Sequence, residues 1–158
     1  MCGIAGLIHK GKTVNIGKEL KDMLQALKRR GPDSTGYALY GEGESDNYIM
    51  RFKVGENVKE GSTAVNEDKS VYDSRRKQVD QHIRDLGANI LQDQQLTPYS
   101  FRYVIKYDKD LMEFSKKIES VEMTEILSLG KTLELVKDIG DATAVSKQYG
   151  LDLSLIHI

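Results

Sequence analysis

The sequence predicts an α+β fold, because segments with the pattern of β-strands alternate along the chain with segments that have the pattern of amphipathic helices. From residue 47 onward the expected order is strand, helix, strand, helix, strand, which suits a small subdomain of the split βαβ type. The chain of 158 residues has the length of one ordinary domain. Such a domain buries ~70% of the surface that its unfolded form exposes, so a core is expected without cross-links.

The first third of the chain predicts three strands and one helix. The opening run is apolar and rich in small residues, as in a buried strand, and the next apolar residues recur at helical spacing until Gly31-Pro32 stops the helix. The third strand alternates, with Met50 and Phe52 expected on its drier face. In order, the expected elements are a strand at 2–9, a helix from Ile16 to Leu27, a strand at 36–41 and a strand at 48–54.

The rest of the chain predicts an α+β region behind a polar connection at 55–70. Asp108 or Asp110 is expected to cap the second of its helices. Alternating SFRYVIKY and the segment VEMTEILSLG predict strands. The expected elements are a helix with its apolar stripe at Val79, Ile83, Leu86 and Ile90, a strand at 100–107, a short helix carrying Leu111, Phe114 and Ile118, a strand within 121–130, and short helices near 131–138 and 141–149.

Composition places the chain among globular proteins, with 39% hydrophobic residues, 30% charged residues and a net charge of -1. Such a charge gives no support to binding of nucleic acid or anionic lipid. The single cysteine cannot form an internal disulfide, and no apolar run reaches the ~18 residues of a membrane span. The start lacks the features of a signal peptide. We therefore expect a cytoplasmic protein with neither a nucleic-acid nor a membrane partner.

Two functional patterns overlap at the start of the chain. Gly6–Thr13 matches the phosphate-loop pattern G-x-x-x-x-G-K-[ST], and Cys2 would become the first residue if the initiator methionine were removed. A phosphate loop leaves a buried strand and enters a helix. Here Leu7 and Ile8 continue the apolar run, and a poor helix start follows the pattern. We therefore interpret Gly6–Thr13 as a strand that runs into a turn.

The chemistry of Cys2 supports a catalytic role better than the sequence around Gly6–Thr13 supports a phosphate loop. Once the initiator methionine is removed, the residue would hold a thiol of pKa ~8.5 beside an α-amine of pKa ~7.7–8.0. Such an amine can take the proton of the thiol and return it later to a leaving group. The alternative is a small buried thiol on a first strand, which is the commonest fate of a free cysteine. Position alone leaves both interpretations open.

A second motif, RRGPDSTG at 29–36, lies about thirty residues downstream. Together, MCGIAG at 1–6 and this turn strongly resemble the class II glutamine amidotransferases, whose glutaminase domain is an N-terminal-nucleophile hydrolase. The resemblance covers residues 1 to about 41, roughly a quarter of the chain. It implies an αββα-type sandwich, here incomplete and with an inserted α+β subdomain.

The resemblance also implies a glutaminase reaction. Cys2 would attack the carboxamide of glutamine, release ammonia and form a γ-glutamyl thioester, which water would hydrolyse to glutamate. Arg30 matches an arginine that helps to order the nucleophile, and a guanidinium there would favour the thiolate. Gly31 would allow close approach of the backbone, and Asp33 would tie down the turn. The ammonia would pass inside the protein to a synthase domain or subunit.

Two parts of the family's site have no match in this sequence. No Asn-Gly pair, which would form the oxyanion hole, occurs in the 158 residues. HIR at 82–84 has the spelling of the H-x-R segment that holds the substrate carboxylate, but we interpret it as a solvated helix face. We therefore expect the front part of a longer protein, inactive alone. The expected division is an amidotransferase core at 1–55, an inserted α+β subdomain at 56–150, and a truncated core element or non-native tail at 151–158.

The long insertion is most like the separately encoded glutaminase subunit of archaeal and clostridial-type glutamate synthases, which add ammonia to 2-oxoglutarate. Asparagine synthetase and other amidotransferases are alternatives, and so is a non-catalytic docking or regulatory module with a degenerate glutaminase fold. No cofactor is expected in this chain, because one cysteine cannot hold an iron–sulfur cluster. The three histidines lie too far apart in the sequence to indicate a metal site.

Overall fold

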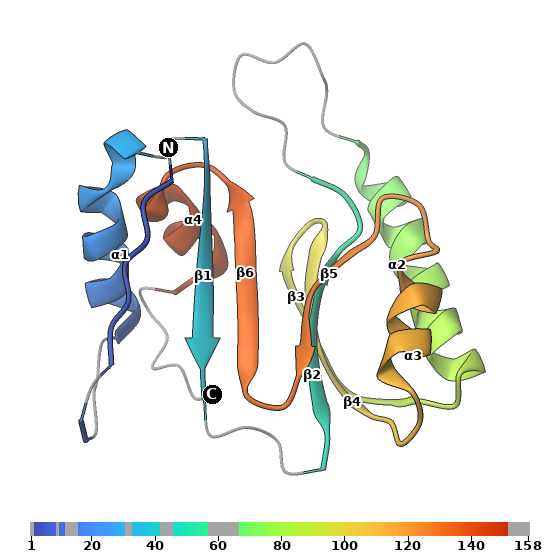
Figure 1. Cartoon of the computed structure of the whole chain (residues 1–158). Coiled ribbons are helices and arrows are strands. Elements are labelled where there is room, and N and C mark those ends of the chain that lie inside the picture. The colour runs from blue at the N-terminus through green and yellow to red at the C-terminus, as the bar shows by residue number, and fades with distance from the viewer. Residues whose placement is uncertain are drawn as a thin grey trace. The chain divides into compact units, whose positions relative to one another are not determined.

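The computed structural model of the chain describes residues 2–8, 10–11, 16–30, 33–41, 46–56 and 67–151 (Figure 1). Their helices and strands alternate, as expected for an α+β fold. In chain order the elements are α1 (Ile16–Ala26), the 3-10 helix η1 (Lys28–Arg30), β1 (Ser34–Tyr40), β2 (Tyr48–Lys53), α2 (Lys69–Asp85), β3 (Asn89–Thr97), β4 (Ser100–Lys106), α3 (Leu111–Ile118), β5 (Glu125–Gly130), β6 (Leu133–Ile139) and α4 (Ala142–Tyr149).

The chain divides into two compact units, which are described separately. Unit 1 consists of Met1–Tyr37 and Val136–Ile158, and unit 2 consists of Ala38–Leu135. The division falls within β1 and within β6. β2 pairs with β4 and β5 of unit 2, and α4 packs against α1 of unit 1. The expected division into core and insertion at 55/56 and 150/151 stays a prediction.

Unit 2 has the βαββαβ order of a split βαβ arrangement, formed by β2, α2, β3, β4, α3 and β5. Its antiparallel sheet has the strand order β3-β4-β2-β5. Figure 1 shows α2 and α3 on the same face of this sheet. The subdomain expected from residue 47 onward is therefore present, with one more strand than the sequence indicated.

Aromatic side chains fill the space between this sheet and its helices. The ring of Phe52 stacks on Phe101 with centroids 5.3 Å apart and meets Tyr103 edge to face at 5.0 Å. Met50 and Phe52 are fully buried, which confirms the drier face of β2. Ile49 on the opposite face is buried as well, so that face is less wet than expected.

β3 was not predicted from the sequence, where the pattern of the preceding helix was extended into it. The strand reads NILQDQQLT, and most of its side chains are polar and exposed, as β3 is one of the two outer strands of this sheet. Ile90, expected on the helix stripe, therefore lies in β3, whereas Val79 and Ile83 are buried on α2 as expected. The signal for the helix end was Gly87, whose φ of +82° suits glycine just past a helix.

The expected helix near 131–138 is wrong, and β6 occupies its place. Glu134, Val136 and Asp138 alternate on the buried side of β6, and none is more than 3% exposed. Because two of these three buried residues are acidic, the apolar alternation that indicates a strand is hidden in the sequence. Pairing with β1 then overrides the helical pattern.

The two short helices that follow aspartates are confirmed. Asp110, rather than Asp108, caps α3 by accepting the backbone N–H of Met112 at 2.7 Å. Asp141 caps α4 by accepting the backbone N–H of Ala144 at 2.9 Å. A short side-chain acceptor at this position satisfies one of the helix's otherwise unpaired N–H groups.

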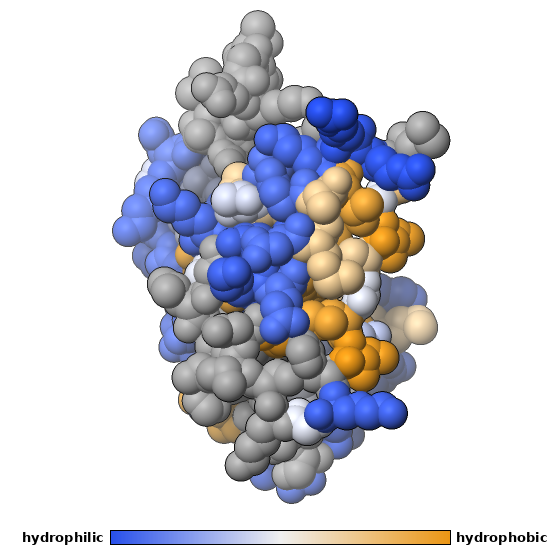
Figure 2. Space-filling model, turned by 90° about the vertical axis from the view of Figure 1, so that its left-hand side faces the viewer, coloured by the Kyte–Doolittle hydropathy of each residue, from blue (hydrophilic) through white to orange (hydrophobic). Residues whose placement is uncertain are grey.

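The N-terminal segment of unit 1 forms no strand, so the expected strand at 2–9 is wrong for residues 2–8, while His9 lies outside the described residues. In the described part of the chain no strand pairs with this segment. Ile4 and Ile8 are 92% and 93% exposed. Figure 2 views the side of the molecule that carries α1 and shows a band of apolar side chains next to strongly hydrophilic ones.

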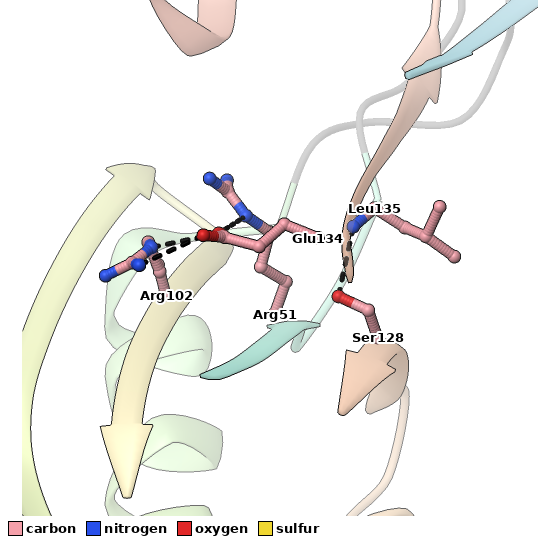
Figure 3. A network of polar contacts seen from close by, with 5 residues as sticks. All are labelled: Arg51, Arg102, Ser128, Glu134 and Leu135. Carbon is pink, nitrogen blue, oxygen red and sulfur yellow. Dashed lines mark hydrogen bonds and ion pairs between the residues drawn. The ribbon is translucent and has the colours of Figure 1, made fainter. Parts of the chain in front are cut away.

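A buried ion cluster lies on the sheet of unit 2 (Figure 3). Glu134 is 1% exposed, and its carboxylate accepts hydrogen bonds from Arg51 Nε at 2.5 Å and from Arg102 Nε and Nη2 at 2.9 and 3.0 Å. The two arginines face each other across β2 and β4. Burial alone would raise the pKa of Glu134, but the hydrogen bonds and charges of Arg102 and Arg51 outweigh it and hold the pKa below its ordinary value.

We expect Glu134→Ala to lower the free energy of unfolding by about 3–5 kcal/mol, because removing one partner of a buried ion pair leaves the other charges uncompensated. Urea denaturation followed by circular dichroism measures this loss. Asp93→Ala is the matched control, since Asp93 pairs with Arg76 at a site where the carboxylate is 56% exposed. Its expected cost is below about 1 kcal/mol. Equal losses in the two variants would contradict a central role for the Glu134 cluster.

Candidate functional site

A polar pocket in unit 1 brings the two sequence motifs together. Its volume is about 290 Å³, near the lower end of the ~300–1,000 Å³ of small-molecule sites. Cys2, Arg30 and Asp33, three of the expected site residues, all line it. Gly31, the fourth, lies outside the described residues. Lys28 and Asp141, which the sequence analysis did not single out, line the same pocket.

Gly3 allows the N-terminal segment to approach η1 closely. A Cβ atom on Gly3 would lie 3.0 Å from the Cβ of Leu27 and 3.5 Å from the Cβ of Arg30. The first of these distances is tighter than ordinary van der Waals contact, so a larger residue at position 3 would push the segment away. Cys2, the residue before Gly3, is exposed and lines the same pocket as Arg30 of the second motif.

Three hydrogen bonds tie the start of β1 to the turn before α4. The backbone N–H of Gly140 donates to the carbonyl oxygen of Asp33 at 3.1 Å, and the Thr35 hydroxyl donates to the carbonyl oxygen of Gly140 at 2.9 Å. The Tyr37 hydroxyl donates to the carbonyl oxygen of Ala142 at 2.7 Å. Because Thr35 and Gly140 are 105 positions apart, one wall of the pocket depends on a distant part of the sequence.

Asp141 is the centre of the polar contacts at this wall. Its Oδ2 lies 2.6 Å from Nζ of Lys28 and accepts a longer hydrogen bond, 3.4 Å, from Nε2 of Gln25. Its Oδ1 accepts the backbone N–H of Ala144, and Gln25 Oε1 accepts the N–H of Thr143 at 3.2 Å. Asp141 thus joins α1 and η1 to the first turn of α4.

These contacts lower the pKa of Asp141 to about 2. The hydrogen bond from Lys28 is the largest cause, and the one from the backbone of Ala144 is the next. Both favour the ionised carboxylate, since hydrogen-bond donors and an adjacent cation stabilise the negative charge. The carboxylate of Asp141 is therefore ionised at neutral pH.

Of the two residues that the sequence analysis missed, only Asp141 had a signal. It stands between a glycine and a helical segment, where an aspartate is typical of an N-cap. Lys28 had none, because a lysine near the end of a helix is usually solvated. Its position in the pocket follows from the ion pair with Asp141, a contact over more than a hundred residues of sequence.

The other sequence patterns contribute nothing to this pocket in the described residues. HIR at 82–84 lies on α2 of unit 2, as expected for a helix, with Ile83 buried. Nδ1 of His82 lies 3.0 Å from the carbonyl oxygen of Lys117. His9, Lys12 and Thr13 of the phosphate-loop pattern lie outside the described residues.

No group of three histidine, cysteine, aspartate or glutamate side chains within the described ranges is arranged to hold a metal ion. The helices in that part of the chain are also too short or too polar to span a bilayer.

Comparison with known proteins gives two similar sequences, while no family model matches the chain. A proposed glutamine amidotransferase of Methanothermobacter thermautotrophicus is 29% identical over 154 residues, which are 94% of this chain and 47% of the relative. The glutamine amidotransferase-like protein GlxB of Rhizobium meliloti is 49% identical over 43 residues, which are 26% of this chain and 14% of that protein. The chain thus spans about half or less of these relatives. The similarities support a relationship to glutamine amidotransferases.

We expect the Lys28–Asp141 pair to contribute to stability only while Asp141 is ionised. Because the folded state lowers this pKa to about 2, the contribution is present above the unfolded pKa of ~3.9 and is lost as pH falls toward 2. Asp141→Asn keeps an N-cap but removes the charge. The variant should be less stable than the wild type by about 0.5–1 kcal/mol at pH 6, and this difference should shrink at pH 3.

Urea unfolding midpoints at the two pH values measure this difference. Asp110→Asn is the control, because Asp110 caps α3 in the same way but makes no ion pair with the described residues. A difference for Asp141→Asn that stays constant between pH 6 and pH 3 would show that the charge of Asp141 is not what stabilises the fold.

Proposed function

We propose that this chain is part of the glutaminase domain of a class II glutamine amidotransferase. One observation carries the proposal: Cys2 lines the same pocket as Arg30 and Asp33, although about thirty residues separate the two motifs. The similarity to two proteins whose names refer to glutamine amidotransferases supports it. Because the chain spans 47% of the Methanothermobacter relative, the activity of a whole amidotransferase is part of the proposal.

In the proposed reaction, the sulfur of Cys2 attacks the carboxamide carbon of glutamine and the carbon–nitrogen bond breaks. The thiol proton passes through the α-amine of Cys2 to the leaving nitrogen, so that ammonia and a γ-glutamyl thioester form. Water then attacks the thioester, releases glutamate and restores the thiol. The amine suits this role because its ordinary pKa of ~7.7–8.0 lies near neutral pH. The reaction requires that the initiator methionine has been removed.

The neighbouring residues have supporting roles in this proposal. Arg30 orders Cys2 and favours its thiolate through its positive charge. The close approach of Gly3 to the Cβ of Arg30 is consistent with that role. Asp33 holds the turn, in agreement with the hydrogen bond that its carbonyl oxygen accepts from Gly140. Gly31 allows the backbone to approach the substrate.

The wider context is proposed from the resemblance of the opening motifs. The fold is an incomplete αββα-type sandwich of an N-terminal-nucleophile hydrolase, with residues 56–150 as its inserted α+β subdomain. Ammonia passes to a synthase domain or subunit, of the glutamate synthase type, in a cytoplasmic protein. No cofactor belongs to this chain in the proposal. The mixed α+β structure with antiparallel sheets is compatible with this context.

Labelling of Cys2 by an electrophilic analogue of glutamine tests the proposed function. The protein as its natural gene encodes it is incubated with a chloroketone analogue, and the mass of the N-terminal peptide is measured. We expect one analogue per chain, bound to Cys2, and no labelling of Cys2→Ala, because that variant has no nucleophile. Excess glutamine should protect Cys2 by competition.

Two neighbouring arginines supply a matched pair of further variants. Arg30→Lys should slow labelling about tenfold, which corresponds to ~1.4 kcal/mol of transition-state stabilisation. Arg29→Lys should leave the rate unchanged, because Arg29 is exposed on η1 and does not line the pocket. Labelling that glutamine does not prevent, or no labelling of the wild type, would overturn the glutaminase proposal in favour of a non-catalytic docking module.

A further inference from the structure

The described residues that line the pocket include an ion pair, Lys28 and Asp141, that has no part in the proposed reaction. Among the residues that the structure describes, four charged side chains line the pocket: Lys28 and Arg30 from η1, Asp33 before β1, and Asp141 before α4. Two are cations and two are anions. Lys28 and Asp141 lie 2.6 Å apart and therefore neutralise each other. Cys2 lines the same pocket as this pair, Arg30 and Asp33.

The two members of the pair differ in how firmly they are held. The Asp141 carboxylate receives Lys28, Gln25 and the N–H of Ala144, and its side chain is only 20% exposed. The Lys28 side chain is 51% exposed and has Asp141 as its one ion-pair partner among the described residues. The carboxylate is thus a fixed negative charge at the pocket wall, and the ammonium of Lys28 is the group that cancels it.

We propose that Lys28 and Asp141 are a positioning pair that sets the electrostatic potential at Cys2, so that Arg30 remains the cation that governs the thiol. The inference rests on the proposed function, since it assigns the pair a role in preparing the nucleophile. An anion near a thiol raises the pKa of the thiol, and a cation lowers it. As long as the charges of Lys28 and Asp141 cancel each other, the pair adds little to the potential at Cys2.

Removing the charge of Lys28 and removing the charge of Asp141 should therefore shift the pKa of the Cys2 thiol in opposite directions. Lys28→Met leaves the carboxylate of Asp141 uncompensated and should raise the pKa of the Cys2 thiol. Asp141→Asn keeps the cap of α4, removes the negative charge and should lower that pKa. A unit charge several ångströms away in a partly solvated pocket shifts a pKa by ~0.5 unit. Both shifts should shrink in 1 M salt, because salt screens the charges.

The rate of Cys2 alkylation by iodoacetamide, measured from pH 6 to pH 10, reports the thiol pKa directly. Wild type, Lys28→Met, Asp141→Asn and the double variant form a cycle. We expect the thiol pKa to rise by ~0.5 unit in Lys28→Met and to fall by ~0.5 unit in Asp141→Asn. In the double variant it should equal the wild-type value within error. A pair that only holds the pocket together would shift both single variants in the same direction, and the double variant further.

Lys18 and Asp22 provide the matched control pair, since they lie 3.0 Å apart on α1 and do not line the pocket. Lys18→Met and Asp22→Asn should leave the alkylation profile unchanged. Shifts of equal sign, or no shift, in the Lys28 and Asp141 variants would overturn the inference. Alkylation by iodoacetamide requires no glutamine binding, so its result is independent of labelling by the glutamine analogue. The first experiment tests the role of the Lys28–Asp141 pair, and the second tests the proposed glutaminase function.

Discussion

The pairing of β6 with β1 is the interaction on which the pocket depends. Gly41 and Thr132 are joined by a backbone hydrogen bond at one end of the β1–β6 pair, and Gly140 and Asp33 at the other, so the strands run antiparallel. The second of these bonds places the turn before α4 beside the turn before β1. Asp141 then pairs with Lys28, and together with Ala142 it lines the pocket. Asp141 and Ala142 lie more than a hundred positions from the two motifs.

The Glu134 cluster and the Lys28–Asp141 pair illustrate two uses of charge. Glu134 is almost completely buried and pairs with Arg51 and Arg102. Removing any one of the three would leave a charge without its partner and lower the free energy of unfolding. The Lys28–Asp141 pair is partly solvated and contributes little to stability. The role proposed for it follows from its position in a pocket that Cys2 also lines, because the reactivity of a thiol depends on the charges around it.

Sequence reasoning predicted most elements in which the apolar pattern is local, such as α1, β2, β4 and α3. It failed at β3 and β6 for a physical reason, because an exposed outer strand and a strand that buries Glu134 and Asp138 do not show apolar alternation. For the site, the motifs predicted that Cys2, Arg30 and Asp33 belong together. Lys28 and Asp141 could not be found in this way, since only tertiary pairing brings them to the pocket.

The central claim is that Cys2 is a nucleophile which uses its own α-amine as the base, and this requires a chain that begins at Cys2. Mass spectrometry of the N-terminal peptide, taken from the protein isolated from its natural source, tests it most directly. We expect a peptide that starts with Cys2 and has an unmodified amine. A peptide that retains Met1, or whose amine is blocked, would contradict the claim, because the thiol would then lack the base that activates it.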